Sequence, residues 1–378
     1  MVKRITWAYE GPVMKLVVDL PDELVGRIRD VVENGGYDNP REFVETAIEN
    51  QLELEEGSES EGFKTLDQAI REYDRAEPGS EDTGGSPEPG SESRPNRSSE
   101  STPEYDIERR SYQEIVPIDP PSLDRVEDGP LWGQYNRLLP VKFVLRRLAN
   151  TLDDQADPGD DLLTVIEHGS FSPAVARDAR TFGKRLEKAD EKKSRGRGEK
   201  LAAGFPTGKK TEKSLDRFES HFVGYSDRNG NLTGAPAALL FVDITASKPS
   251  EIGITEAGLD FAELMNPVLD ETIEADEPLY PEERGFYLEH IAERLPAELE
   301  AMVCTAQAIQ SGHNRPTSLT EQVAELNSDW SQAQASTNRS GLVSRMYELS
   351  LVDRFRVGQR GIGYELTKEG NEFLQRHT

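Results

Sequence analysis

Two groups of cationic side chains stand out in a chain that is otherwise strongly acidic. Residues 332–364 contain five arginines and two acids, a local charge of +3 in a chain of 378 residues with a net charge of −27. The guanidinium group of arginine forms paired hydrogen bonds with base edges and with phosphate oxygens. This segment therefore predicts contact with DNA. The alternative is a protein-interaction module whose arginines pair with acidic neighbours.

A second cationic group lies at residues 184–213, which hold eleven lysines and arginines against five acids. Glycines interrupt this segment, and eight of the fourteen lysines of the chain lie in it. A basic, flexible arm can grip phosphates without reading sequence. We expect Lys192, Lys193, Arg195 and Arg197 to make such contacts. The alternative is a solvated insertion loop that is helical at its start.

The residue types that support catalysis or metal binding lack a suitable spacing. The five histidines are scattered, and none lies at a ligand spacing from another or from Cys304. The sequence shows no phosphate-binding loop, no nucleophile elbow and no dinucleotide fingerprint. We therefore expect a protein that is not an enzyme and that uses no metal ion and no cofactor.

The number of cysteines and the length of apolar runs indicate the cellular compartment of the protein. Cys304 is the only cysteine, so an intramolecular disulfide is excluded and a cytoplasmic location is expected. The N-terminus lacks the apolar run of a signal peptide. The longest apolar run, residues 237–242, is far shorter than the roughly 20 residues of a membrane helix. We expect no membrane partner.

The overall composition is acid-rich, poor in lysine and inclined to arginine, and it resembles proteins of halophilic archaea. Many carboxylates keep a protein surface hydrated in brine. At about 1 M salt the screening length is roughly 3 Å, so distant like charges hardly interact. An acidic protein that binds DNA is therefore physically acceptable at high salt.

Residues 13–56 combine one strand with two short helices. Apolar residues alternate along 14–20, the period of a half-buried strand, and Pro21 ends it. Two helices with apolar faces follow, separated by a glycine-rich turn at 35–40, and Asn39 can cap the second. One strand and two helices of this size cannot bury a core alone. We therefore expect a homodimer through this segment.

This pattern resembles the ribbon-helix-helix family of the Arc, MetJ and CopG kind. In that family a ribbon of two strands enters the major groove of DNA, and the start of the second helix binds a phosphate. The resemblance implies base contacts from Lys15, Val17 and Asp19, and phosphate contacts from Asn39 and Arg41. Val and Asp depart from the polar or basic residues usual at outward positions, so a ribbon that mainly dimerises is the alternative.

Residues 57–128 are predicted to be an acidic, low-complexity linker that is mostly disordered. Between residues 77 and 103 there is little but Gly, Ser, Pro, Glu and Asp. Such a segment cannot bury enough apolar surface to offset its ordering entropy.

An eight-residue pattern occurs twice, at residues 254–261 and 366–373. Both copies read apolar, Thr, two variable residues, Gly, two variable residues, Phe. A predicted strand precedes each copy, so the threonine is expected to cap a following helix and the phenylalanine to pack back onto the domain. Upstream of the first copy, residues 227–230 predict a tight turn and residues 237–244 a buried strand.

The second copy closes a region of three predicted helices, the third near 336–349, and a β-hairpin at 352–357 and 364–366. This order resembles the winged helix-turn-helix family over residues 296–376, and residues 131–265 resemble it more weakly. The resemblance implies that the third helix enters the major groove and that the hairpin, or wing, meets phosphates. By that resemblance the groove contacts fall on Gln334, Thr337, Asn338, Ser340, Ser344 and Arg345, and the phosphate contacts on Arg354, Arg356 and Arg360.

These features predict a mainly α protein with small β elements. Winged-helix-like domains are expected at 129–270, with the basic insertion, and at 280–378. The expected function is sequence-specific binding of double-stranded DNA by a homodimer that acts as a transcriptional regulator. The alternatives are a plasmid or virus replication-initiation or partition protein, and a protein-interaction scaffold.

Overall fold

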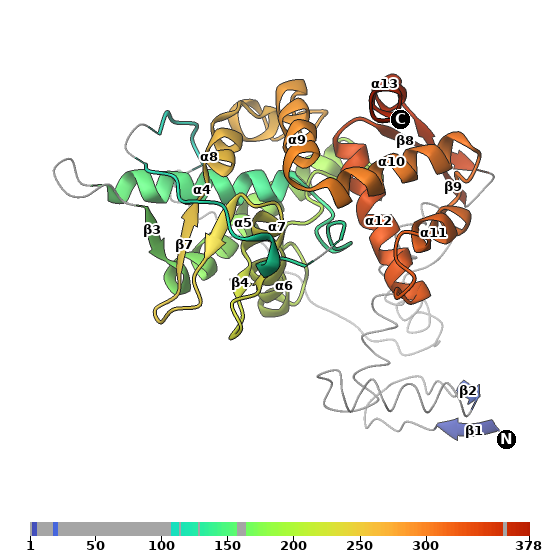
Figure 1. The fold of residues 1–378 in the computed structure, drawn as a ribbon, viewed down its shortest axis with the longest axis horizontal. Helices are drawn as coiled ribbons and strands as arrows, with labels where there is room; N and C mark the ends of the chain where they lie inside the picture. Colours follow the sequence, from blue (N-terminus) through green and yellow to red (C-terminus); the bar gives the residue numbers. More distant parts are fainter. Residues whose placement is uncertain are drawn as a thin grey trace, which may run out of the picture. The chain divides into compact units, whose positions relative to one another are not determined.

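The computed structural model describes residues 2–5, 18–21, 107–112, 115–127, 129–156, 164–357 and 361–378. The chain divides into two compact units, Met1–Pro89 and Gly90–Thr378 (Figure 1). In the N-terminal unit, β1 (Val2–Ile5) pairs antiparallel with β2 (Val18–Pro21). A strand at residues 2–5 was not predicted from the sequence pattern. The predicted homodimer stays a prediction, because the structure contains one chain.

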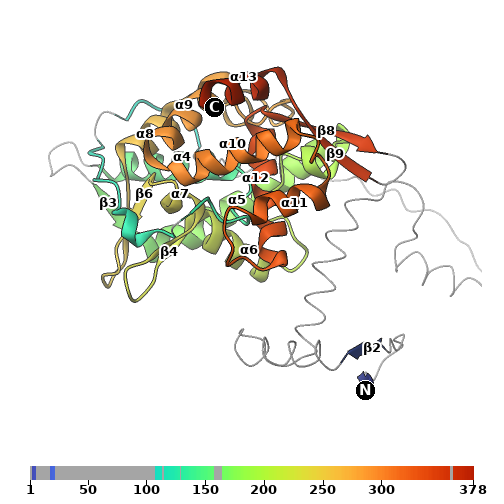
Figure 2. The same ribbon diagram turned by 45° about the vertical axis from the view of Figure 1, so that its right-hand side comes forward.

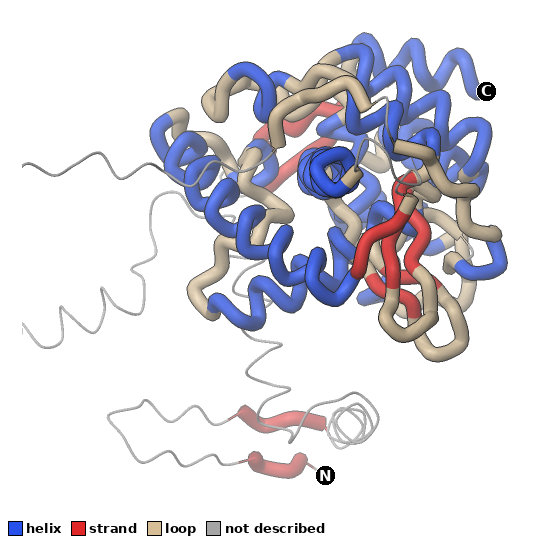
Figure 3. The backbone as a smooth tube through the Cα atoms, turned by 90° about the vertical axis from the view of Figure 1, so that its left-hand side faces the viewer, coloured by secondary structure: helices blue, strands red, loops and turns tan. Residues whose placement is uncertain are grey.

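The C-terminal unit is mainly helical with small antiparallel sheets (Figure 3). We call residues 129–270 the central module and residues 280–378 the C-terminal module. One continuous cluster of buried apolar side chains runs through both. The helices and strands of the central module are α4 (Leu139–Gln155), β3 (Val165–Glu167), α5 (His168–Lys192), α6 (Thr211–Phe218), the π-helical η3 (Glu219–Val223), β4 (Tyr225–Ser226), β5 (Leu232–Thr233), α7 (Ala235–Ala238), β6 (Val242–Ile244), β7 (Glu251–Ile254) and α8 (Glu256–Glu263), with short turns at η2 (Arg197–Glu199) and η4 (Pro267–Glu271).

The central module is built on a three-stranded sheet with strand order β3-β7-β6. Both pairings are antiparallel, and Gly253 of β7 lies opposite Val165 and Asp243. Ordered packing begins before residue 129, where the predicted linker was expected to end. Ile107 is buried, and Arg125, in the short helix η1 (Leu123–Arg125), forms an ion pair of 2.7 Å with Asp243. This end of the segment is therefore part of the fold.

Two cations are buried on α4, the helix that the rest of the central module surrounds. Lys142 lies 3.0 Å from the carboxylate of Glu283 on α9 (Pro281–Arg294), and burial lowers its pKa to about 8. Arg146 lies 2.7 Å from Asp270 and donates to backbone carbonyls. Buried charges require partners of this kind, so these pairs fix α4 against α8 and α9.

The C-terminal module contains α9, α10 (Pro296–Gln310), α11 (Pro316–Ala324), α12 (Gln332–Glu348), the hairpin of β8 (Val352–Val357) and β9 (Gly361–Leu366), and α13 (Lys368–His377) (Figure 2). Ser331 caps α12 in a capping box with Gln334. In the hairpin, Val352 lies opposite Leu366. The predicted third helix and hairpin are confirmed at these positions, with α12 beginning a turn earlier than expected.

The repeated sequence pattern has the predicted structure in the C-terminal module. The Thr367 hydroxyl accepts a hydrogen bond from the backbone N–H of Gly370 and donates to the carbonyl oxygen of Ser350, at 2.9 and 2.6 Å. Ser350 has a φ of 56°. Gly370 lies against the carbonyl oxygen of Leu351, with no room for a Cβ atom. Phe373 is buried.

The central module repeats these contacts with different residues. The Thr255 hydroxyl accepts from Gly258 and donates to the carbonyl oxygen of Leu240, which has a φ of 58°. Gly258 lies against the carbonyl oxygen of Phe241, and the Phe261 side chain is buried. The two copies are therefore structurally equivalent, with Leu240 matching Ser350.

This equivalence corrects the strand predicted at residues 237–244. The first residues belong to α7, which matches the last turn of α12, and only β6 is a strand. The predicted turn at 227–230 is confirmed as the tip of the β4–β5 hairpin. Gly224 precedes β4 and Gly234 follows β5, and the backbones of these two glycines, both at positive φ, lie in contact at the base of the hairpin. The hairpin thus separates α7 from α6 and η3 along the chain, while α7 and η3 remain in contact.

Candidate nucleic-acid interface

Of the residues of the N-terminal unit that are predicted to contact DNA, only Asp19 lies within the described residues. Lys15, Val17, Asn39 and Arg41 lie outside the described residues. Asp19 lies in β2, opposite Arg4 of β1. Base reading by this ribbon stays a prediction.

The first half of α12 is open to solvent. Gln334 and Ser340 are exposed, and Thr337 is half-buried. Arg339 is half-buried and donates to hydroxyl oxygens of Thr320 and Tyr364, so it is held in place by its own module. The N-terminal half of α12 can therefore meet a ligand.

Asn338, near the middle of α12, and most of the second half of the helix are buried, and the predicted placement of three groove-reading residues is wrong. Arg345 is fully buried, Asn338 is 5% exposed and Ser344 is 7% exposed. These side chains cannot face a DNA groove because residues 131–139 of the central module cover one face of the helix. Asn338 accepts a hydrogen bond of 2.8 Å from the backbone N–H of Gly133.

Arg345 forms the centre of this contact between the modules. Its guanidinium group donates to both carboxylate oxygens of Glu298 on α10, at 2.8 and 3.1 Å. It also donates to the carbonyl oxygens of Tyr135 and Leu131. One helical turn further on, Glu348 accepts from the backbone N–H of Leu138. Arg345 is therefore a structural residue.

The predicted wing arginines differ in their surroundings. Arg354 is half-buried, its guanidinium group lying against Gly198 and 5.3 Å from the ring centre of Tyr347. Arg356 is exposed, and Arg360 lies outside the described residues. Of these three predicted phosphate contacts, Arg356 has the accessibility that the prediction requires.

The predicted flexible arm is ordered for most of its length. α5 continues to Lys192, which forms an ion pair with Glu274, and Lys193 pairs with Asp276. The side chain of Arg195 is nearly buried and lies 2.9 Å from Asp190. Three of the four predicted phosphate contacts therefore have partners within the protein. Arg197 lies in η2, but its side chain is not among the described ones.

The reason for this order is a buried carboxylate in α5 and a set of apolar anchors after it. Asp190 is 1% exposed and accepts hydrogen bonds from the backbone N–H groups of Leu201 and Ala202, at 3.1 and 2.9 Å. Leu201 and Phe205 enter the core. Charge counting along the sequence did not reveal that one acid holds the loop.

A cationic surface on α5 and α6 includes part of the basic segment 184–213 and extends beyond it to Arg177 and Arg217. These helices pack against each other, and Arg180 of α5 donates to the carbonyl oxygens of Pro206 and Gly208, just before α6. Residues 177–217 contain fourteen lysines and arginines and seven acids, so 14 − 7 gives +7. We define the α5–α6 surface by its exposed cations, namely Arg177, Arg185, Lys188, Lys209, Lys213 and Arg217.

An aromatic cluster adjoins this surface. The rings of Trp132 and His221 meet edge to face with their centres 5.4 Å apart, and Tyr135 meets Trp132 at 5.6 Å. Trp132 is 40% exposed. Burial, and to a lesser extent the charge of Arg217, lower the pKa of His221 to about 4, so this ring is neutral near pH 7.

The low pKa of His221 predicts a loss of stability in acid. In the unfolded chain this group takes up a proton near its ordinary pKa of 6.5, whereas in the folded state it does so near 4. The contribution of neutral His221 to the free energy of unfolding is therefore fully present above pH 6.5 and is lost as the pH falls to about 4. Between pH 7 and pH 4.5, the free energy of unfolding should fall by about 1–2 kcal/mol less in His221→Phe than in the natural protein. Denaturant unfolding at the two pH values measures this difference. Equal pH dependence in both proteins would contradict this assignment.

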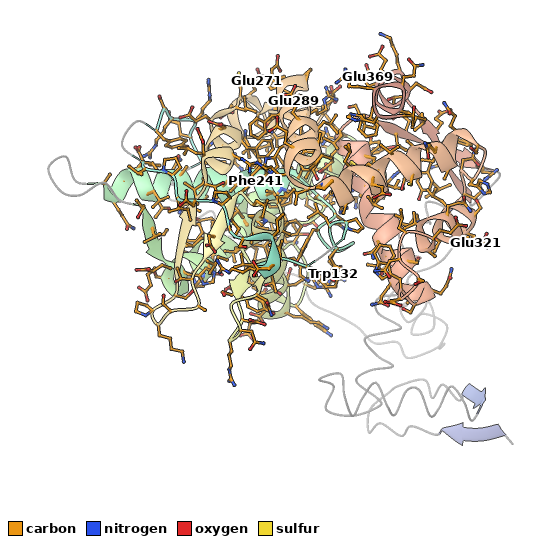
Figure 4. All side chains as sticks on the ribbon, viewed as in Figure 1. Trp132, Phe241, Glu271, Glu289, Glu321 and Glu369 are labelled. Atoms are coloured by element: carbon orange, nitrogen blue, oxygen red, sulfur yellow. The ribbon has the colours of Figure 1, made fainter. Side chains whose placement is uncertain are left out.

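Acidic side chains gather elsewhere in the C-terminal unit. A cavity of about 540 Å³ lies between residues 117–120 and the helices α8 and α9. Its lining includes five carboxylates, which repel phosphate: Asp119, Glu256, Asp260, Glu289 and Glu293. Figure 4 shows Glu289 and Glu271 at the upper side of this unit and Trp132 at its lower side. Figures 1 and 2 place α6 and the β4–β5 hairpin on that lower side.

No protein-family model, no curated protein and no solved structure matches this chain. Within the described residues, none of the helices is long and apolar enough to cross a membrane. The same residues contain no group of three or more His, Cys, Asp or Glu side chains placed to hold a metal ion.

Proposed function

We propose that this chain is a sequence-specific DNA-binding protein that acts as a transcriptional regulator without catalysis. The observation that carries the proposal is the α5–α6 surface. Its exposed cations stand in a chain whose net charge is −27, and solubility alone gives no reason to concentrate scarce lysines there. Positive side chains grouped on one surface favour binding to the phosphate backbone of DNA.

The equivalence of the two modules supports this proposal in a second way. Each has helices followed by a two-stranded hairpin and a capped helix, which is the order of the winged helix-turn-helix family that the sequence resembles. In our proposal the open N-terminal half of α12, with Gln334 and Ser340, reads the DNA, and Arg356 meets a phosphate. The buried half of the helix joins the two modules.

Homodimerisation through residues 13–56 belongs to the same proposal. Two linked copies of a DNA-binding unit bind paired sites far more tightly than one copy does. A replication-initiation or partition protein of a plasmid or virus would use the same arrangement on repeated sites, and footprinting on promoter and repeat sequences distinguishes the two roles.

The proposal predicts that α6 carries phosphate contacts. Changing both Lys213 and Arg217 to Gln should weaken binding to every duplex sequence alike, since phosphates are the same in all. Each lost phosphate contact lowers the slope of log K against log salt by about 0.9, so the slope should fall by up to about 1.8. Fluorescence anisotropy with labelled duplexes over a salt series measures both quantities.

A matched control removes the same charge from another exposed helix. Lys368 and Arg376 of α13 are exposed, and changing both to Gln should leave affinity and slope close to those of the natural protein. Identical losses in the two double variants would show a general effect of net charge and would refute the α5–α6 surface as the contact. Absence of duplex binding by the natural protein would refute the proposed function.

The burial of the second half of α12 favours one other function, that of a protein-interaction scaffold. This helix packs on the central module of the same chain through Asn338 and Arg345, and such a contact supports a module that binds protein surfaces. The α5–α6 surface weighs against this function. A scaffold would need an acidic partner protein to bind these cations, whereas DNA offers phosphates directly.

A further inference from the structure

We propose that Trp132, His221 and Tyr225 form a stacking platform for the unpaired bases of single-stranded DNA. This inference rests on the proposed function and deepens it. The protein would bind a duplex through its cationic surface and would also hold a nucleotide strand that has been opened. The three residues come from the segment before α4, from η3 and from β4.

Two rings of the platform, Trp132 and His221, contact each other, and both contact the buried ring of Tyr135. Trp132 meets both His221 and Tyr135 edge to face, with ring centres 5.4 and 5.6 Å apart. Tyr135 is 8% exposed and its hydroxyl accepts a hydrogen bond from the backbone N–H of Gly234. The buried tyrosine thus anchors the cluster to the neck of the β4–β5 hairpin, where Tyr225 begins β4.

The outer rings remain open to solvent. Trp132 is 40% exposed and Tyr225 is 46% exposed, and they are the two aromatic side chains among the exposed large hydrophobic residues of the described part of the chain. Packing within the C-terminal unit gives no reason to leave large rings uncovered. Aromatic rings next to cations are what a binding surface for nucleotide bases requires, because each base offers a flat π-face.

The cations follow a helical row that ends at the platform. Lys213, Arg217 and His221 are spaced four residues apart along α6 and η3, so they lie along one side of the helix. Lys213 and Arg217 are exposed. Arg217 precedes His221 by four residues on this continuous helix, so this cation lies beside the cluster. A strand whose phosphates follow this row would bring its bases to Trp132.

Base stacking selects unpaired over paired DNA. In a duplex the faces of each base are covered by its neighbours, so a protein ring reaches them only after a base is displaced. The edges of the bases in a groove would instead require hydrogen-bond donors and acceptors. Trp132 and Tyr225 present mainly ring surface, which is why we assign single strands to this site.

The test uses the full-length protein and three labelled probes. These are a single-stranded oligothymidine, an abasic strand of the same length, and a duplex. We expect Trp132→Ala to weaken oligothymidine binding roughly tenfold, in the range found for one base stacked on one aromatic ring, and to leave duplex binding unchanged. Trp132→Phe should restore most of the affinity. Leu123→Ala, at another exposed apolar residue, should have no effect.

Three results would overturn the proposal. They are unchanged oligothymidine binding by Trp132→Ala together with Tyr225→Ala, equal binding of the abasic strand and oligothymidine by the natural protein, and an equal loss of duplex and single-strand affinity in Trp132→Ala. Each of these leaves duplex binding by the natural protein intact, so it is distinguishable from failure of the proposed function. Far-ultraviolet circular dichroism confirms that each variant is folded.

Discussion

Replacing Arg345 with methionine should lower the free energy of unfolding by about 3–5 kcal/mol, the usual result of removing one partner from a buried ion pair. Glu298 is 1% exposed and would keep its charge with the guanidinium group gone. The carbonyl oxygens of Tyr135 and Leu131 would lose donors as well. Denaturant unfolding in concentrated salt, followed by circular dichroism, measures this difference.

Two further variants make the result specific. Arg356→Met changes an exposed arginine of the same module and should alter stability by less than about 0.5 kcal/mol. Changing Arg345 and Glu298 together to methionine removes both charges of this pair, so neither is left buried without its partner, and the double variant should recover at least about half of the loss. An Arg345 variant as stable as the natural protein, but with weaker DNA binding, would instead support the position in the groove that the sequence suggested.

Replacing Gly370 with alanine should destabilise the C-terminal module by about 3 kcal/mol, at the upper end for overpacking. The added methyl group would overlap the carbonyl oxygen of Leu351. That oxygen is fixed because it accepts a hydrogen bond of 3.1 Å from the backbone N–H of Thr367. The backbone at Leu351 and the helix α13 would therefore have to move apart. Gly258→Ala should do the same in the central module, where Phe241 takes the place of Leu351.

Gly285 provides the matched control for both glycine variants. It lies inside α9, and a Cβ atom there would meet nothing within 4 Å. Alanine is favoured over glycine within a helix, so Gly285→Ala should raise the free energy of unfolding by about 0.5–1 kcal/mol. Loss of stability in all three variants would show that the loss does not depend on the close approach of the carbonyl oxygen, and would contradict this explanation.

The sequence by itself determined several local elements of the C-terminal unit. The repeated pattern around Thr255 and Thr367 predicted a helix cap and a returning phenylalanine in each module, and both are present. The alternating and helical periods predicted α12 and the β8–β9 hairpin. These features depend on residues close in the chain, where hydrogen bonds of caps and turns are set by local residue types.

For the apolar run at 237–244, the local sequence pattern did not distinguish a strand from a helical turn. A short apolar run fits a buried strand and a buried helical turn equally well. The match of Leu240 to Ser350, with a positive φ at both, decided that a helical turn comes first and a strand after it. Contacts from Thr255, fifteen residues along the chain, hold this bend.

Only the tertiary structure decided which cations face solvent. Arg345 was grouped with the other arginines of 332–364 because charge along the sequence does not reveal a partner, and Glu298 lies 47 residues away. The lysines at 192 and 193 likewise meet acids more than eighty residues distant. The aromatic cluster joins Trp132 to His221 across the fold. Ion pairs and ring contacts depend on how segments pack, so residue type fixed the available chemistry and the fold determined which groups remained free to bind.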